Sequence, residues 1–218
     1  METQSHDITI DKQQIAAMPT VVFDGEITVV QTAEEAEAVL TALAAEKIVG
    51  FDTETKPSFK KGHINTVSLL QLSTDKHCVL IRLNHTGFTD AIRSFLEDEN
   101  VIKIGLSLKD DFGVLHRLGD FTPRGFVDLQ TMVRKYHIAD SSLQKIYGII
   151  FGKRISKSQR LSNWEAPTLT HSQCLYASTD AWACLRIYRT LLAGLFHPVL
   201  PAASSDNLSI PQSTSLTI

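Results

Sequence analysis

Hydrophobic and polar positions follow two different periods along the first third of the chain. Residues 26–32 (EITVVQT) alternate and are rich in β-branched side chains, which predicts a strand. Residues 32–46 repeat apolar positions at the helical period, and Thr32 with Glu35 forms a capping-box signature. Turn-length segments then separate three short apolar or alternating runs, at residues 47–55, 66–73 and 77–83. These runs predict a meander of neighbouring antiparallel strands.

The rest of the chain alternates between helical and strand patterns. Strands are expected at residues 101–108 and 125–130, and helices at residues 89–98, 109–119, 129–137 and 170–195, with a short helix near residue 143. Residues 152–164 are polar and basic without a period, which predicts a connection. A meander followed by alternating helices and strands predicts an α/β fold, with a mixed β-sheet of antiparallel and parallel strands flanked by α-helices.

Composition favours one main domain. The chain has 218 residues and is 43% hydrophobic, enough for a single well-formed core. We expect an N-terminal extension over residues 1–20, the domain over 21–197, and a flexible tail over 198–218, which is rich in Ser, Thr and Pro and has no basic residue. The formal net charge is −3, so a surface that binds a polyanion must be a local patch.

The cysteines and the N-terminus indicate a reducing compartment. Cys78, Cys174 and Cys184 form no CxxC pair and no zinc-type cluster, so we expect them to be small core side chains. No signal peptide pattern and no run of about 18 apolar residues occurs. We therefore expect a cytoplasmic protein that does not enter a membrane.

Two acids on the strand of residues 47–55 need an explanation. Asp52 and Glu54 share one face of this strand because side chains alternate, and Gly50 on the same face leaves room beside them. Two unpaired carboxylates in a sheet interior are costly, so a cation is expected near them. The alternative is a strand that runs out into solvent, with Glu54 already in a loop.

Two further sets of polar residues could belong either to a functional site or to ordinary surface structure. Asp110 and Asp111 lie at a helix's first turn, where carboxylates also favour the helix dipole, and at most one of them can face the sheet edge. Tyr176 and Asp180 are one helical turn apart on a common face. A hydrogen-bonded surface pair would explain them equally well if they stood alone.

Together, three motifs point to a family. Residues 51–55 (FDTET), 105–115 (GLSLKDDFGVL) and 176–180 (YASTD) resemble, in order and separation, the three exonuclease motifs of the DEDD superfamily of 3′–5′ exonucleases, in its tyrosine subgroup. Over roughly residues 21–195 the chain is similar to ribonuclease D and Werner-syndrome-type exonuclease domains. This resemblance implies a ribonuclease H-like fold and a metal-dependent 3′–5′ exonuclease.

The resemblance assigns site residues one by one. Asp52 and Glu54 correspond to the first-motif acids, and Asp111 matches the second-motif acid better than Asp110 because Leu115 completes its D-x-x-x-L pattern. Tyr176 and Asp180 correspond to the third motif. A histidine variant of that motif needs His where this chain has Leu175.

The implied chemistry is phosphodiester hydrolysis with two metal ions. Four carboxylates without Cys or His suit Mg²⁺ or Mn²⁺, and two such ions about 4 Å apart can clamp the attacking and leaving oxygens. By family likeness Asp52 would bridge both ions, Glu54 and Asp180 would hold one and Asp111 the other. Tyr176 would orient the attacking water, and the product would be a nucleoside 5′-monophosphate.

Basic residues near these motifs are candidates for contact with nucleic acid. They flank the proposed site in two stretches that contain no acid, and Trp164 adds a ring that could stack on a base or simply pack. The candidate nucleic-acid-binding residues are Lys56, Lys60, Lys61, Lys153, Arg154, Lys157, Arg160 and Trp164. The expected partner is a single-stranded 3′ end of DNA or RNA.

Two other functions compete with an active exonuclease. One alternative is a catalytically weak nucleic-acid-binding or scaffold protein of the same fold. A missing motif carboxylate would favour it, but all four carboxylates are present. A phosphatase or nucleotidase with an acidic metal site would need another motif order. Asp128, between a strand and a helix, is expected to be a structural cap.

Overall fold

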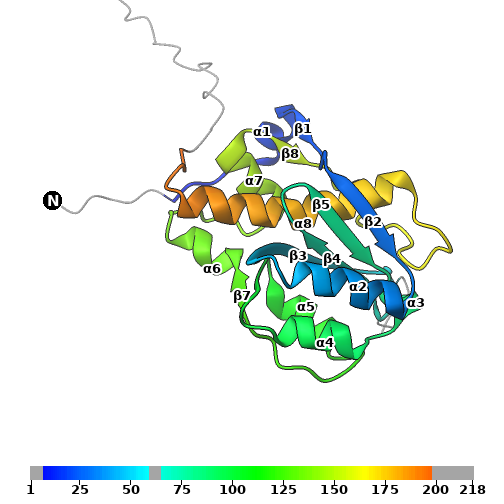
Figure 1. The fold of residues 1–218 in the computed structure, drawn as a ribbon. Coiled ribbons are helices and arrows are strands. Elements are labelled where there is room, and N and C mark those ends of the chain that lie inside the picture. The colour runs from blue at the N-terminus through cyan, green and yellow to red at the C-terminus, as the bar shows by residue number, and fades with distance from the viewer. Residues whose placement is uncertain (1–6, 59–64, 198–218) are drawn as a thin grey trace, which may run out of the picture.

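A six-stranded mixed sheet forms the centre of the protein in the computed structural model, which describes residues 7–58 and 65–197 (Figure 1). In sheet order the strands are β2 (Glu26–Val30), β5 (His77–Ile81), β4 (Val67–Ser73), β3 (Ile48–Thr55), β6 (Ile102–Gly105) and β7 (Phe126–Asp128). Strands β3, β4 and β5 pair antiparallel, β2 is parallel to β5, and β6 and β7 continue parallel to β3. The predicted mixed α/β sheet is confirmed.

Helices cover both faces of this sheet. The long helix α8 (His171–Leu192) crosses one face, where the same core cluster takes in residues of α7 (Leu143–Phe151), α6 (Leu129–Arg134) and α1 (Lys12–Ala17). The other face packs against α2 (Ala33–Leu43), α3 (Leu83–Thr86), α4 (Asp90–Glu97) and α5 (Leu108–Leu115). The protein therefore has three layers and two hydrophobic cores, one on each side of the sheet.

Alternation along β3 divides its side chains between the two cores. Val49 and Phe51 are fully buried against α2, α4 and α5. Gly50 faces α8, and a Cβ atom added there would lie 1.9 Å from the carbonyl oxygen of Ala181. The space at Gly50 is thus filled by the backbone of α8. This close approach sets Asp180 of α8 beside Asp52 of β3.

The predicted helix starts are confirmed by their caps. Thr32 accepts a hydrogen bond from the backbone N–H of Glu35, and the Glu35 side chain accepts one from the N–H of Thr32. Helix α8 begins with the same reciprocal arrangement between Thr170 and Gln173. Helix α5 is shorter than predicted: it ends at Leu115, and a turn follows up to Gly119.

The N-terminal region has structure that the hydrophobic pattern did not indicate. Ile15 of α1 and Met18 are buried in the core on the α8 side, and Ile8 forms a parallel bridge with Ile138. A two-stranded parallel sheet joins β1 (Thr20–Val21) to β8 (Arg154–Ile155). The domain boundaries at residues 20/21 and 197/198 remain predictions.

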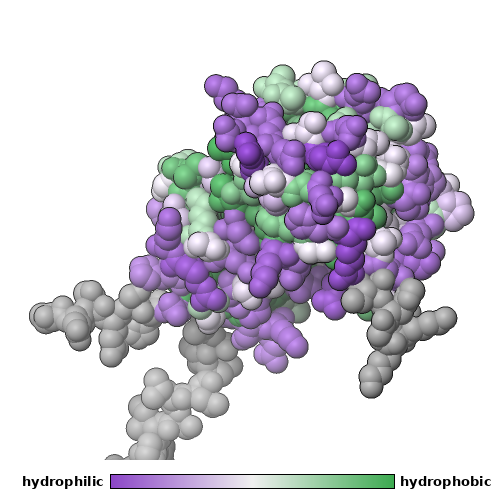
Figure 2. Space-filling view, turned by 90° about the horizontal axis from the view of Figure 1, so that it is seen from below, coloured by the Kyte–Doolittle hydropathy of each residue, from purple (hydrophilic) through white to green (hydrophobic). Residues whose placement is uncertain are grey.

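One face of the protein combines apolar and hydrophilic side chains. Seen from the side on which α4 and α5 lie, an apolar band is bordered by hydrophilic side chains (Figure 2). Among the described helices, none is both long and apolar enough to cross a membrane.

Candidate active site

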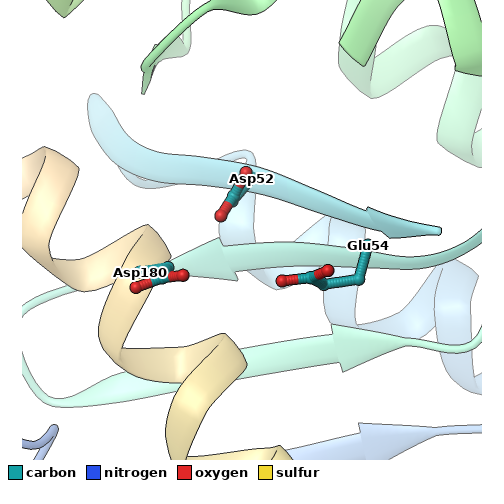
Figure 3. Close-up of side chains that lie close together, drawn as sticks. All are labelled: Asp52, Glu54 and Asp180. Atoms are coloured by element: carbon teal, nitrogen blue, oxygen red, sulfur yellow. The ribbon is translucent and has the colours of Figure 1, made fainter. Parts of the chain in front are cut away.

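Three carboxylates meet between β3 and α8. Asp52 and Glu54 extend from the same face of β3, and Asp180 approaches from α8 (Figure 3). One carboxylate oxygen from each residue lies within 4.8 Å of the other two. The alternative in which Glu54 belongs to a solvated loop is excluded, because Glu54 lies inside β3 and is only partly exposed.

Burial and mutual repulsion raise the pKa values of these acids. For Asp52 the larger cause of the raised pKa is burial, and the charge of Asp180 adds to it. The pKa of Glu54 is raised by burial and then by its acidic neighbours, while that of Asp180 is raised by burial. None of the ion pairs within the described residues involves these three acids.

This donor set fits a divalent cation. Like charges so close together are unfavourable unless a proton or a cation joins them, and oxygen ligands are those that Mg²⁺ and Mn²⁺ prefer. The carboxylate group of Asp52, Glu54 and Asp180 therefore has the chemistry of a hard metal site.

Asp111 lies beside this group but outside it. It is 8% exposed, whereas its neighbour Asp110 is exposed, so Asp111 is the acid that points inward from α5. The Thr53 hydroxyl donates a 2.5 Å hydrogen bond to Asp111 Oδ1. The pKa of Asp111 is raised by burial and then by the charge of Asp52.

Asp128 fixes the helix that carries Asp111. Its carboxylate accepts hydrogen bonds from the backbone N–H groups of Ser107 (3.2 Å) and Leu108 (3.0 Å) at the start of α5. It also accepts one from Gln130 N (2.8 Å), as cap of its own helix α6. Asp128 is the structural cap that was predicted, and it serves two helices.

Tyr176 completes the group from one helical turn before Asp180. Its hydroxyl donates a hydrogen bond to the Asp180 carboxylate. Burial and the surrounding carboxylates raise the pKa of Tyr176, so the phenol stays protonated. A protonated phenol can orient a water molecule but cannot remove its proton.

Two of the candidate basic residues face the acids. Exposed Lys157 and Arg160 lie beside a cavity of 510 Å³ whose wall also includes Tyr176 and Asp180. Burial raises the pKa values of Glu54 and Asp180, and the charges of Arg160 and Lys157 respectively offset a small part of that rise. Each cation is therefore close enough to act on a carboxylate of the site.

Of the other basic candidates that the structure describes, none lines the cavity of 510 Å³. Lys56 forms a 2.9 Å ion pair with Glu165, and Arg154 donates through Nε to the carbonyl of Met18 at 3.1 Å. Lys153 is exposed just before β8. Lys60 and Lys61 lie outside the described residues.

Trp164 is fully buried, which leaves its ring no free face for a nucleobase. The ring packs in the core on the α8 side, with its centroid 6.0 Å from that of Tyr176. Of the two alternatives left open by the sequence, packing therefore fits Trp164. Its contact with Tyr176 gives it an indirect connection to the site.

Gln71 is a buried polar residue outside the three sequence motifs. It lies directly opposite Asp52 in the antiparallel pair of β3 and β4, and it is fully buried. Neither of its amide atoms has a hydrogen-bond partner within the described residues. Its only signal in the sequence is a polar side chain inside an apolar strand.

Comparison with known families gives one match that covers most of the chain. A family model described as 3′–5′ exonuclease matches residues 27–195. The bifunctional 3′–5′ exonuclease/ATP-dependent helicase WRN of Mus musculus is 32% identical over 184 residues. That match covers 80% of this chain and 13% of the mouse protein, so the chain corresponds to a small part of its relative.

Solved structures match in fold. The EXO domain of Aedes aegypti Nibbler superimposes with a TM-score of 0.70 at 21% identity, covering 88% of this chain and 93% of that one. Trypanosoma brucei RNase D, in a complex with RNA U12, gives a TM-score of 0.67 at 18% identity, covering 83% of this chain and 64% of the other. The ribonuclease H-like fold predicted from the motifs is thus confirmed.

Proposed function

Because the chain belongs to the family of 3′–5′ exonuclease domains, in its ribonuclease D- and WRN-like group, we propose that it removes nucleotides from the 3′ ends of nucleic-acid strands. Each cleavage would hydrolyse the last phosphodiester bond and release a nucleoside 5′-monophosphate. The observation that carries the proposal is the meeting of Asp52, Glu54 and Asp180 within 4.8 Å, beside Tyr176.

We infer that these acids hold two divalent ions, Mg²⁺ or Mn²⁺. Asp52, Glu54 and Asp180 supply the central ligands, and Asp111 takes part from α5. When bound, such ions stabilise charge on the attacking and leaving oxygens of an in-line displacement at phosphorus. Burial and then mutual repulsion raise the pKa values of these acids, and a bound cation would offset this cost of ionising them.

The remaining groups would act on the substrate and on water. Tyr176 donates a hydrogen bond to Asp180, and its oxygen keeps lone pairs that can accept a hydrogen bond from the attacking water. Lys157 and Arg160 would contact phosphates of the strand, since both are exposed and face the cavity of 510 Å³. We propose a single-stranded 3′ end as substrate, and the RNA-bound neighbour supports nucleic acid as its class.

A substrate series with 5′-labelled strands tests this function. Purified protein would receive single-stranded DNA, single-stranded RNA and recessed duplexes, each with Mg²⁺, Mn²⁺ or a chelator. We expect stepwise shortening from the 3′ end of at least one substrate with metal, release of nucleoside 5′-monophosphates, and no shortening with the chelator. Binding to these strands without shortening under any condition would instead favour a binding or scaffold protein.

The metal-free protein should lose stability as pH rises. The carboxyl groups of Asp52, Glu54, Asp111 and Asp180 have raised pKa values in the fold. A group of this kind stabilises the fold fully below its unfolded pKa, at about 4, and this contribution is lost as pH rises through the folded pKa. In chelator, Tm should fall by roughly 5–10 °C between about pH 5 and pH 9.

Excess Mg²⁺ or Mn²⁺ should flatten this pH dependence, because a bound cation favours the ionised carboxylates. Differential scanning fluorimetry across the pH range, with and without metal, measures both effects. Equal slopes with and without metal would contradict the assignment of these acids as ligands.

A further inference from the structure

Arg82 is a fully buried arginine at the end of β5. It follows Ile81 directly and has no exposed surface. Among the described residues, no carboxylate lies within ion-pair distance of its guanidinium. A buried charge without a counter-ion destabilises the fold, so we expect the hydrogen bonds of Arg82 to have a structural or functional role.

Those hydrogen bonds go mainly to one short stretch of backbone. Nη1 donates to the carbonyl of Pro167 at 2.8 Å, and Nη2 donates to the carbonyl of Ala166. A long contact of 3.5 Å joins Nη1 to Gln31 Oε1, and Nε has no partner within the described residues. Arg82 thus connects the central sheet to residues 166 and 167.

Residues 166 and 167 belong to a segment with no helix or strand of its own. We call residues 156–170, between β8 and α8, the basic segment because it carries Lys157 and Arg160. Long irregular connections in compact domains are uncommon and are often functional. Without a helix or sheet ladder, side-chain contacts must fix the position of this one.

Other contacts hold the middle of the basic segment. The Gln173 amide donates to Ser162 Oγ and to the Asn163 carbonyl, both at 3.1 Å. Trp164 is fully buried, and Glu165 pairs with Lys56. Arg82 fixes the residues that follow, where the segment turns toward α8.

We propose that Arg82 is a positioning residue that holds the basic segment in the place where Lys157 and Arg160 face the carboxylates. This inference rests on the proposed function. Arg82 does not touch the acids or line the cavity beside them, so it acts through the two cations. Its loss should weaken the binding of the strand far more than the chemical step, because phosphate contacts made before and during reaction affect KM.

Kinetics of Arg82→Met and Arg82→Lys test the proposal. We expect Arg82→Met to raise KM for the best oligonucleotide by about tenfold or more while kcat changes less than threefold. Arg82→Lys should recover part of the loss, because its ammonium group can still donate to a carbonyl. If both variants lower kcat and leave KM unchanged, the proposal is overturned.

A matched control separates positioning from general stability. Arg186 is a partly buried arginine of α8 that donates to the Tyr147 hydroxyl at 3.0 Å and lies over the rings of Phe151 and Trp182. Arg186→Met should lower Tm without raising KM. An equal rise in KM in Arg186→Met and Arg82→Met would mean that Arg82 acts only through stability.

A double-mutant cycle tests whether Arg82 affects KM through Lys157 and Arg160. If Arg82 works through the cations, Arg82→Met should raise KM much less when Lys157 and Arg160 are already replaced by Ala. Fully additive effects would overturn this route.

Proteolysis gives a readout that does not depend on activity. Trypsin should cut after Lys157 or Arg160 faster in Arg82→Met than in Arg186→Met, because the segment is held less firmly. Equal cleavage rates would overturn the proposal. If the wild-type protein shortens no strand, the proposed function fails, and the cleavage rates still decide whether Arg82 holds the segment.

Discussion

Replacing Asp52 with Asn should nearly abolish exonuclease activity and at the same time make the metal-free protein more stable. Asp52 lies at the centre of the carboxylate group, next to Glu54 and Asp180. Asparagine has nearly the same shape but no negative charge. The substitution therefore removes a proposed metal ligand and a source of repulsion in one step.

The two effects have different sizes and separate measurements. We expect shortening of a 5′-labelled strand to slow by about a thousandfold or more, as for loss of a group that stabilises charge at the reacting atoms. In chelator near pH 8, Tm should rise by roughly 3–10 °C, from relief of about 1–3 kcal/mol of burial and repulsion. Added Mg²⁺ should raise Tm less in the variant than in the wild type.

Asp110→Asn is the matched control for this charge change. Asp110 is an exposed acid at the first turn of α5, one residue before Asp111. Its replacement should leave activity within a few-fold of wild type and should not raise Tm. A Tm of Asp52→Asn in chelator below that of the wild type would contradict the view that Asp52 is destabilising without metal.

Replacing Gly50 with Ala should damage both the fold and the site. A Cβ atom there would meet the carbonyl oxygen of Ala181 at 1.9 Å and its carbonyl carbon at 2.7 Å. Both are backbone atoms, so no side chain can turn aside, and α8 would have to move away from β3. We expect a loss of about 3 kcal/mol or more, or roughly 6–12 °C in Tm.

The same movement should reduce activity, because Ala181 is the neighbour of Asp180 in α8. Gly113→Ala is the matched control: this glycine lies in α5 with no atom within 4 Å of an added Cβ. Alanine in a helix is favoured over glycine by about 0.5–1 kcal/mol, so Tm should stay equal or rise. An active Gly50→Ala protein with unchanged Tm would contradict the close packing of α8 on β3.

The central part of the site follows from local periodicity. Asp52 and Glu54 share a face because strand side chains alternate, and Tyr176 and Asp180 share one because they are four residues apart in a helix. The strand meander and the capped start of α2 depend on similarly local patterns. These features could be predicted because a few neighbouring residues determine each of them.

Other features depend on contacts between distant segments. No sequence period connects the segments that meet in these contacts. They are the burial of Trp164, the hydrogen bond from Thr53 to Asp111, and the hydrogen bonds from Arg82 to the carbonyls of residues 166 and 167. The environment of Gly50 also depends on a contact between distant segments. Its small size was visible in the sequence, but only the packing shows that α8 fills the space.

Calorimetric titration with Mn²⁺ tests most directly whether the carboxylates of β3 and α8 form a divalent-metal site. Wild type, Asp52→Asn and Asp110→Asn would be titrated under the same conditions near neutral pH. We predict saturable binding to wild type and Asp110→Asn, and at least about tenfold weaker binding to Asp52→Asn. Equal Mn²⁺ affinity in wild type and Asp52→Asn, or no binding to the wild type, would contradict this prediction.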